Sequence, residues 1–463
     1  MTSAPSGRVV SDPVSPAVVV ALLLPVVAGY VAVFVYAMQQ FSYDIWGAIW
    51  VAPVLIAISV PILIRFARGE PNPRIGQLLI AALVLKLAAS VPRYYMVVYL
   101  YETGDSLRYG DTARLLRQDF LNLDFSLTTL GPDSRSGTEF IEIVTGAVYT
   151  LIGPSFVGGF VFFSWLSFWG LFFFYRAFRV AIPDGDKTRY AVLLFFLPSM
   201  LFWPSSIGKE AWMTLMLGLT AYGGARLLAR ERGATIYVLL GLVGVLAVRP
   251  HVALLVVAGL GLAYLVRSRS GQRAIALGKF RTFLGLTVIA VATLFLIRRV
   301  TAYFGIDEFS LESAAETLEY AEGQSAQGGS AFNEGAPSFS NLPVSLVTVL
   351  FRPFLFEAHN IQALLTALEG TMLLLLFVLS WPRLRSIPGR LRKQPYVTFC
   401  ITYTVLFCFV FSAFQNFGLL ARERVMVYPF VLVLLALPAA AAKARANQRA
   451  ETPGNYALAA ARE

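Results

Sequence analysis

The chain has 463 residues, of which 57% are hydrophobic and only 14% are charged, and it carries a formal net charge of +11. Its mean hydropathy of +0.67 is far above that of soluble globular domains, so the composition excludes a soluble enzyme. Lys and Arg gather in the cytoplasmic loops of membrane proteins, and this alone makes such chains basic. The positive charge therefore does not indicate a nucleic-acid partner.

Apolar runs of about 20 residues, the length that crosses a bilayer, recur along the whole sequence. They predict an all-α polytopic bundle with about twelve transmembrane helices, forming a single integral membrane domain over 1–463. A further apolar run, 344–356, is interrupted by Arg352-Pro353 and is too short to span, so we predict a re-entrant segment there. The predicted spans are 17–37, 47–65, 75–100, 156–178, 190–204, 208–228, 235–249, 251–267, 282–298, 360–381, 396–415 and 424–441.

Basic residues occupy alternate loops of this predicted bundle. They follow the second, fourth, sixth, eighth, tenth and last apolar runs. By the positive-inside rule all these loops are cytoplasmic if both termini are inside. We therefore predict a multi-pass protein of the cell (inner or plasma) membrane, with cytoplasmic tails at 1–16 and 442–463. Two long loops, 102–155 and 299–360, then lie on the extracytoplasmic side.

The first outer loop, 102–155, contains an amphipathic stretch just after Asp105. This pattern is typical of an interfacial helix that lies on the membrane, and 140–152 is expected to lie in the same way. In the second outer loop, 312–340 is acidic and rich in Gly and Ser, a composition that favours mobility. The apolar face of the first stretch comprises Tyr109, Ala113, Leu116 and Phe120.

Two charged residues fall in the middle of predicted membrane helices, Lys86 in 75–100 and Glu369 in 360–381. Such residues normally face the interior of a bundle and pair, so we expect a structural Lys86–Glu369 ion pair.

Four short charged motifs break the positive-inside pattern, each where a predicted helix meets the extracytoplasmic side. Arg offers forked donors and Lys a point charge, so several such residues from different helices predict a basic pocket for a phosphate or pyrophosphate. The alternative is that they bind lipid headgroups or stabilise loops, and His251 could simply cap a helix. The residues predicted to bind phosphate are Lys209, Arg249, His251, Arg352, Arg422 and Arg424.

A carboxylate beside such a pocket is a candidate general base. Asp105 opens the first outer loop and is our first choice, with Asp111 as the nearest rival and Glu102 and Glu210 as the others. Asp105 could instead cap the following helix, because caps favour Asp. The sequence contains neither a P-loop nor a Cys/His cluster, so no metal site and no nucleotide site is predicted.

An acidic residue that opens the first large outer loop and precedes an interfacial helix resembles the GT-C fold of membrane glycosyltransferases, which use polyprenyl-phosphate sugars as donors. In that family the catalytic carboxylate follows the first helix of a seven-helix module. Here Asp105 follows the third predicted helix, so the resemblance assigns the third to ninth helices to a GT-C-like module. The stretch Phe202 to Glu210 (FWPSSIGKE) and Arg422-Glu423-Arg424 also resemble multi-spanning proteins of bacterial exopolysaccharide clusters, including O-antigen polymerase-like proteins.

The leading hypothesis is a membrane-embedded glycosyltransferase. It would move a sugar from a polyprenyl-phosphate donor to a glycan or lipid acceptor at the extracytoplasmic face, for cell-envelope polysaccharide assembly. The expected partners are the lipid-linked donor, the acceptor and membrane lipids, and no cofactor beyond the polyprenyl-phosphate-linked sugar itself is predicted. The alternatives are an O-antigen or exopolysaccharide polymerase, a non-enzymatic polyprenyl-lipid transporter (flippase), and a structural subunit of an envelope complex.

Overall fold

The computed structural model describes residues 16–102, 104–130, 137–267, 293–303, 316, 332 and 339–439. Within these residues every regular element is a helix, which confirms the predicted all-α class. Most of the predicted tails, of the acidic portion 312–340 and of the predicted span 282–298 lies outside the described residues. The elements used below are α1 (Pro16–Gln40), α2 (Tyr43–Ala67), α3 (Arg74–Ala88), α4 (Ser90–Tyr95), η1 (Met96–Tyr101), α5 (Asp105–Leu121), α6 (Thr138–Ile152), α7 (Phe156–Ala181), α8 (Lys187–Phe196), α9 (Pro198–Phe202), α10 (Lys209–Leu228), α11 (Ala234–Val248), α12 (Pro250–Val266), α15 (Leu342–Phe351), α16 (Ile361–Leu379), α17 (Trp381–Leu384), α18 (Pro395–Phe411), α19 (Phe417–Glu423), η6 (Arg424–Met426) and α20 (Tyr428–Leu435).

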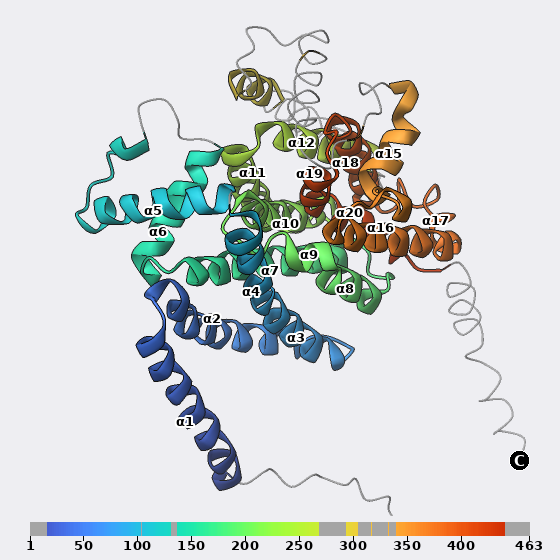
Figure 1. Ribbon diagram of the computed structural model, residues 1–463. Helices are drawn as coiled ribbons and strands as arrows, with labels where there is room; N and C mark the ends of the chain where they lie inside the picture. The colour runs from blue at the N-terminus through green and yellow to red at the C-terminus, as the bar shows by residue number, and fades with distance from the viewer. Residues whose placement is uncertain are drawn as a thin grey trace, which may run out of the picture.

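The centre of the bundle is α10, which lies against α7 on one side and α11 on the other (Figure 1). Glycines allow the close approach of α7 and α10. A Cβ atom at Gly218 would stand 2.2 Å from the backbone oxygen of Gly170, and one at Gly170 would stand 2.3 Å from the backbone oxygen of Thr214. Small residues at such contacts let two membrane helices pack backbone to backbone.

The remaining helices surround this centre in two groups. In the N-terminal group, α2 and α3 pack on α7, while α1 contacts α2 and projects from the body of the molecule (Figure 1). In the C-terminal group, α12 packs on α18 and α15 packs on α18 and α16. The short α20 is buried along its whole length among these helices.

Among the described residues, four helical segments are long and apolar enough to cross a membrane: α2, the run Arg74–Tyr101 formed by α3, α4 and η1, α7, and α16. Shorter apolar helices of 10–17 residues include α11, α12, α15 and α18. The predicted span 190–204 is divided between α8 and α9, because Pro198 lacks the N–H that would continue the helix. The predicted re-entrant segment corresponds to α15, which ends at Arg352-Pro353.

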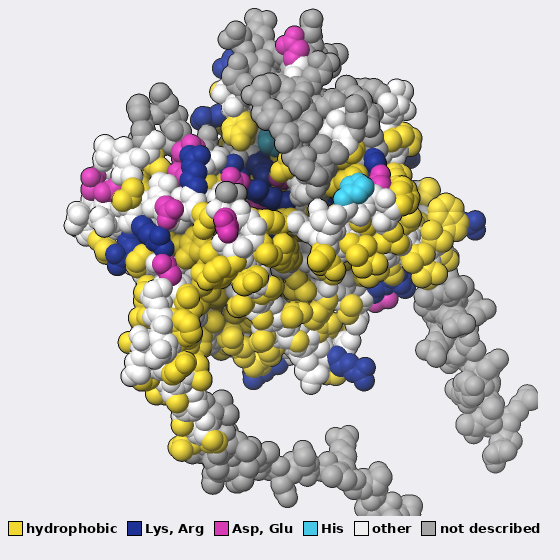
Figure 2. Space-filling view, viewed as in Figure 1, with side chains coloured by type: hydrophobic (Ala, Val, Ile, Leu, Met, Phe, Trp, Pro, Cys, Tyr) yellow, Lys and Arg dark blue, Asp and Glu magenta, His cyan; other side chains and the backbone are white. Residues whose placement is uncertain are grey.

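Several helices expose rows of large apolar side chains. In α2, Val54, Ile58 and Ile62 are 45%, 51% and 47% exposed, and they share one face. In α16, Leu365 is 63% and Leu379 is 74% exposed. Figure 2 shows a broad hydrophobic surface over the centre and lower part of one face, with acidic and basic side chains gathered above it. Apolar surface of this extent is typical of a membrane-facing protein.

Three of the loops predicted to be cytoplasmic bond directly to one another and so lie at one end of the molecule, here named the basic end. Their hydrogen bonds and ion pairs join Arg179 to Glu70 (2.7 Å), Asn72 to Thr188 (3.1 Å), Arg189 to Ser380 (2.7 Å) and Arg390 to Asp184 (2.9 Å).

The starts of the long helices lie at the other end. Arg114 of α5 bonds Asp44 at the start of α2 (2.7 Å), and Tyr101 of η1 donates to Gln362 at the start of α16. A helix of 19–25 residues is about 28–38 Å long, so α2 and α16 separate these contacts from the basic end. The predicted interfacial helix, α5, therefore belongs to the end opposite the basic loops. Its predicted inner face is buried at Tyr109, Ala113 and Leu116.

The expected Lys86–Glu369 ion pair is wrong. Lys86 instead donates to the backbone oxygens of Met200 (2.6 Å) and Leu201 (3.1 Å), and Glu369 accepts from the backbone N–H of Ser199 (2.7 Å). The break between α8 and α9 leaves backbone N–H and C=O groups without helical hydrogen bonds in an apolar interior. Each such group, left unsatisfied, would destabilise the fold by roughly several kcal/mol. The two charged side chains satisfy those groups and so hold α9 in place.

Candidate functional site

The candidate site is built where α5 begins, next to the loop that joins α9 to α10. Gly104 has a φ of +136°, a conformation that glycine adopts without strain, and the chain turns there into α5. The hydroxyl of Ser106 then donates to the backbone oxygen of Ile207 at 2.7 Å. This bond sets the first turn of α5 beside the first turn of α10. Asp105 is thereby brought close to Glu210, although it is the first helical residue rather than the cap.

Charged side chains from three further elements complete a linked set. Arg422 of α19 donates through Nε to Glu210 (2.5 Å) and through Nη2 to Asp105 (3.0 Å). Arg249, at the junction of α11 and α12, forms a forked pair with Glu423, and its Nη2–Oε1 distance is 2.7 Å. Arg249 also approaches Glu210 at 3.6 Å, which joins the two pairs. We call Asp105, Lys209, Glu210, Arg249, Arg422 and Glu423 the ion-pair cluster.

The ion-pair cluster has a buried centre and is electrically balanced. Glu210, Arg249 and Glu423 are 5%, 9% and 7% exposed. Three cations face three carboxylates, so the cluster differs from the bare basic pocket that the charged motifs suggested. Two arginines predicted to bind phosphate, Arg249 and Arg422, already hold carboxylates. A buried charge needs such a partner. An added anion must therefore bind a cation of the cluster other than these two arginines.

Lys209 is the remaining cation of the cluster. Among the residues that the structure describes, it forms neither an ion pair nor a hydrogen bond, although it lies in the field of Arg249, Asp105 and Glu210. It is the first residue of α10, where the helix dipole also favours an anion. An ammonium group in this position can accept a negatively charged ligand without displacing an internal partner.

Asp105 is the most accessible carboxylate of the cluster. Its side chain is 53% exposed, whereas that of Glu210 is 6% exposed. One oxygen of Asp105 accepts from Arg422, and its other oxygen has no partner within the described part of the chain. Asp105 can therefore accept a proton from a substrate hydroxyl, while Glu210 serves Arg422 and Arg249.

Two neighbouring groups have fixed protonation states. Burial alone would lower the pKa of Arg422, but the surrounding carboxylates, Glu210 first, raise the pKa of this guanidinium above its ordinary value. Burial also raises the pKa of Tyr109 well above its ordinary value, and the negative charges of Asp105 and Glu210 add to this. Tyr109 thus stays a neutral phenol and cannot act as the base.

His251 lies near the cluster, in the first turn of α12. Its ring packs near the rings of Tyr303 and Phe411, with centroid distances of 6.2 and 5.9 Å. The positive charges of Arg249 and Lys209 act on it. Four of the six predicted phosphate-binding residues therefore gather here: Lys209, Arg249, His251 and Arg422.

Three predicted site residues lie outside the ion-pair cluster. Asp111 pairs with Arg114 at 3.0 Å on the exposed face of α5. Arg424 is 1% exposed and donates to the backbone oxygens of Val349 (2.5 Å), Thr348 (3.3 Å) and Arg352. Arg352 itself pairs with Glu357. Arg424 and Arg352 thus join η6 to the end of α15.

Sequence reasoning missed two members of this region. Glu423 was seen only as part of a motif, yet it holds Arg249. Arg93 was not singled out, although it is a charged residue within the apolar run 75–100, the signal that marked Lys86. The guanidinium of Arg93 lies over the rings of both Trp203 and Phe202, and the charges of Glu210 and Arg422 act on it.

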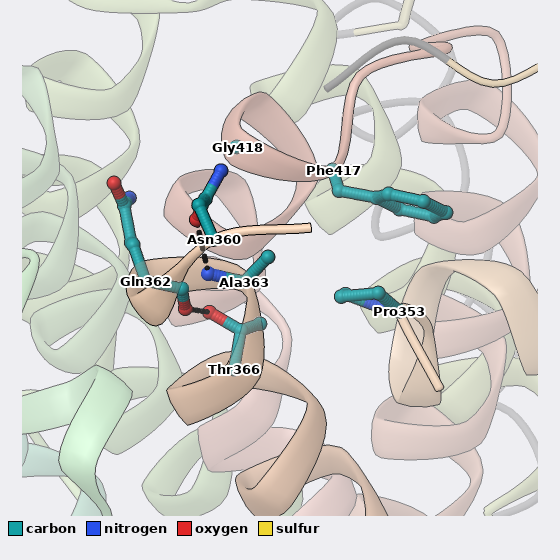
Figure 3. Close-up of a pocket in the computed structure, with 7 residues that line it drawn as sticks. All are labelled: Pro353, Asn360, Gln362, Ala363, Thr366, Phe417 and Gly418. Atoms are coloured by element: carbon teal, nitrogen blue, oxygen red, sulfur yellow. Dashed lines mark hydrogen bonds between the residues drawn. The ribbon is translucent and has the colours of Figure 1, made fainter. Parts of the chain in front are cut away.

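A small cavity of about 40 Å³ opens between the start of α16, the start of α19 and Pro353 (Figure 3). Asn360 accepts from the backbone N–H of Ala363 at 2.8 Å on its wall. Gln362 points away from Phe417 and Pro353, which close the other side (Figure 3). The residues that line the cavity are Pro353, Asn360, Gln362, Ala363, Thr366, Phe417 and Gly418.

The arrangement provides an accessible carboxylate, an unpaired ammonium and fixed guanidinium groups at one end of the bundle. In the part of the chain that the structure describes, no group of three or more His, Cys, Asp or Glu side chains is arranged to hold a metal ion. Comparisons of the chain with family models, with curated proteins and with solved structures gave no match.

Proposed function

We propose that this chain is a glycosyltransferase of the plasma membrane with a GT-C-like bundle of about twelve spans. Both termini lie in the cytoplasm, and the ion-pair cluster faces the extracytoplasmic side. The enzyme takes a sugar from a polyprenyl-phosphate donor and adds it to a glycan or lipid acceptor. Single transfer and polymerisation use the same chemistry and differ in the acceptor.

The observation that carries this proposal is that an accessible carboxylate and an available ammonium group lie at the same end of the molecule. The half-exposed carboxylate of Asp105 and the unpaired ammonium of Lys209 belong to the same cluster, at the end opposite the loops that the positive-inside rule assigns to the cytoplasm. A lipid-linked donor needs a cation for its phosphate at headgroup depth, and an acceptor hydroxyl needs a base.

In the proposed reaction the carboxylate of Asp105 takes the proton of the acceptor hydroxyl. The acceptor oxygen forms a bond to the anomeric carbon of the sugar, and the bond from that carbon to the donor phosphate breaks. The phosphate leaves with the electron pair, and Lys209 stabilises its negative charge. Arg422 holds Asp105 through one oxygen, which leaves the other oxygen directed to the substrate.

A transporter of the same lipid would need charged side chains along a path that both faces can reach. The clustered charges here lie at one end, and the two deeper ones, Lys86 and Glu369, bind backbone groups around α9. This distribution favours the enzyme over the flippase.

The test is Asp105→Asn in proteoliposomes that contain the purified protein and polyprenyl-phosphate donors with a radiolabelled hexose or pentose. Asn keeps an oxygen for Arg422 but cannot take a proton. Transfer should fall by about 10²–10⁴-fold, the usual contribution of a general base, while donor binding persists.

Asp111→Asn is the matched control, because Asp111 lies on the same helix and pairs with Arg114 outside the cluster. It should transfer at nearly the normal rate. If Asp105→Asn transfers normally and Asp111→Asn or Glu210→Gln does not, then Asp105 is not the base.

A further inference from the structure

Arg93 is a buried cation that forms no ion pair with any residue that the structure describes. It is 7% exposed, and its Nε and Nη1 atoms are buried without a hydrogen-bond partner in the described part of the chain. Its guanidinium carbon lies 4.8 Å from the ring centroid of Trp203 and 5.0 Å from that of Phe202. Aromatic faces stabilise a cation only in part, and unpaired N–H donors of a buried guanidinium remain costly.

The position of Arg93 relates this charge to the ion-pair cluster. Glu210 and Arg422 are the charged groups that act on it most strongly. The cluster itself is balanced, so Arg93 leaves the region with one positive charge in excess. A single added anion would restore the balance and would satisfy the unpaired N–H groups.

The helical segment that carries Arg93 also exposes large apolar side chains. Arg93 belongs to the apolar segment Arg74–Tyr101, which is long enough to span a membrane. In this segment Tyr95 is 56% and Leu100 is 61% exposed, and Ile361 at the start of α16 is 80% exposed. At this border Tyr101 donates to Gln362, so a single side-chain hydrogen bond joins η1 to α16. Tyr101 also acts electrostatically on Arg93, so this border lies beside the guanidinium.

We propose that Arg93 binds the phosphate of the lipid carrier, and that the carrier enters sideways between η1 and α16. This inference rests on the proposed function and assigns its phosphate contact to a residue inside an apolar run. Arg93 supplies forked donors to the phosphate oxygens, a geometry that Arg provides and Lys does not. Lys209 then neutralises the same group from the side of the ion-pair cluster.

The experiment measures binding without turnover. Purified protein in nanodiscs is titrated with short-chain polyprenyl phosphate, phosphatidylglycerol and inorganic phosphate, and the dissociation constants are compared. Arg93→Gln removes the charge and keeps a planar group beside the two rings. Loss of a charge-assisted pair should weaken polyprenyl phosphate binding by about 10- to 100-fold. Arg93→Lys should weaken it less.

A matched control is Arg385→Gln. Arg385 also stacks on a tryptophan, Trp381, at 5.4 Å, but it lies at the basic end, and its loss should leave binding unchanged. Thermal unfolding of ligand-free protein is a second readout. Because Arg93 has neither an ion-pair nor a hydrogen-bond partner among the described residues, Arg93→Gln should not lower the unfolding temperature, whereas polyprenyl phosphate should raise it in the wild type and not in the variant.

Three outcomes overturn the inference. If Arg93→Gln binds polyprenyl phosphate normally while Asp105→Asn abolishes transfer, the phosphate lies elsewhere and the proposed function stands. If Arg93 is needed equally for phosphatidylglycerol or inorganic phosphate, the residue holds a general anion rather than the carrier. If wild-type protein does not bind polyprenyl phosphate at all, the proposed function fails together with this inference.

Discussion

The pair formed by Arg249 and Glu423 allows a sharp test of how the candidate site is held together. Arg249 joins the end of α11 to α19, and both side chains are almost completely buried. Removing one partner of a buried ion pair costs about 3–5 kcal/mol, because the other charge remains without compensation. In Arg249→Met, Glu423 loses its ion-pair partner, so the loss should lie in this range. In Glu423→Met, Arg249 retains Glu210 at 3.6 Å, so the loss should be smaller.

The measurement is reversible unfolding in mixed micelles, followed by circular dichroism as the fraction of denaturing detergent rises. The double variant Arg249→Met/Glu423→Met should lose less than the sum of the two single variants, with a coupling of about 1–3 kcal/mol. The exposed pair Arg226–Glu231 (2.7 Å) is the matched control and should contribute less than about 1 kcal/mol. Additive losses, or a loss below about 1 kcal/mol in Arg249→Met, would refute the structural role. Arg249 would then be free to bind phosphate, as its motif suggested.

Two further predictions concern the fold. Gly218→Ala should destabilise the protein by about 1–3 kcal/mol in the same assay, because the added methyl group meets the backbone of α7, whereas Gly29→Ala in α1 has open space and should not destabilise it. The second prediction concerns Asp184. Partial burial alone would raise the pKa of this carboxyl, but hydrogen bonds from Arg390 and Gln394 lower the pKa below its ordinary value. A lowered pKa in the folded state means that this contribution to stability is present above about pH 4 and is lost as the pH falls further. Asp184→Asn should therefore show a flatter fall in unfolding temperature between pH 5 and pH 3, and an unchanged slope would contradict the assignment.

Much of the architecture could be predicted from the sequence because apolar length and helical periodicity are local properties. The bounds of α2, α7, α10 and α16 match the predicted runs to within about four residues. The grouping of basic loops at one end also follows from a compositional rule. The breaks in long helices were harder to predict, since the division of 190–204 depends on Lys86 and Glu369, which meet the exposed backbone groups from other helices.

The candidate site shows where a single sequence stops being informative. Charged motifs at helix ends identified Lys209, Glu210, Arg249 and Arg422, and the structure brings these four together. The sequence could not show which charges neutralise one another, because each pair joins residues far apart in the chain. Arg422 and Asp105, for example, are 317 positions apart.

This pairing changes how the site should bind an anion. An arginine at the end of a membrane helix looks available in the sequence, but in the fold a carboxylate already occupies Arg249 and Arg422 from another element. Both arginines therefore fix the geometry of the site more than they add positive charge. The charge that remains for a ligand comes from Lys209 and Arg93, and neither has an internal ion-pair partner among the described residues. Lys209 lies at the start of α10, and Arg93 lies in the apolar segment Arg74–Tyr101. In the proposed function the phosphate of the lipid-linked donor is the ligand of both charges, because the lipid part of the donor can pack on the apolar side chains that this segment exposes. A soluble anion has no lipid part to make that contact.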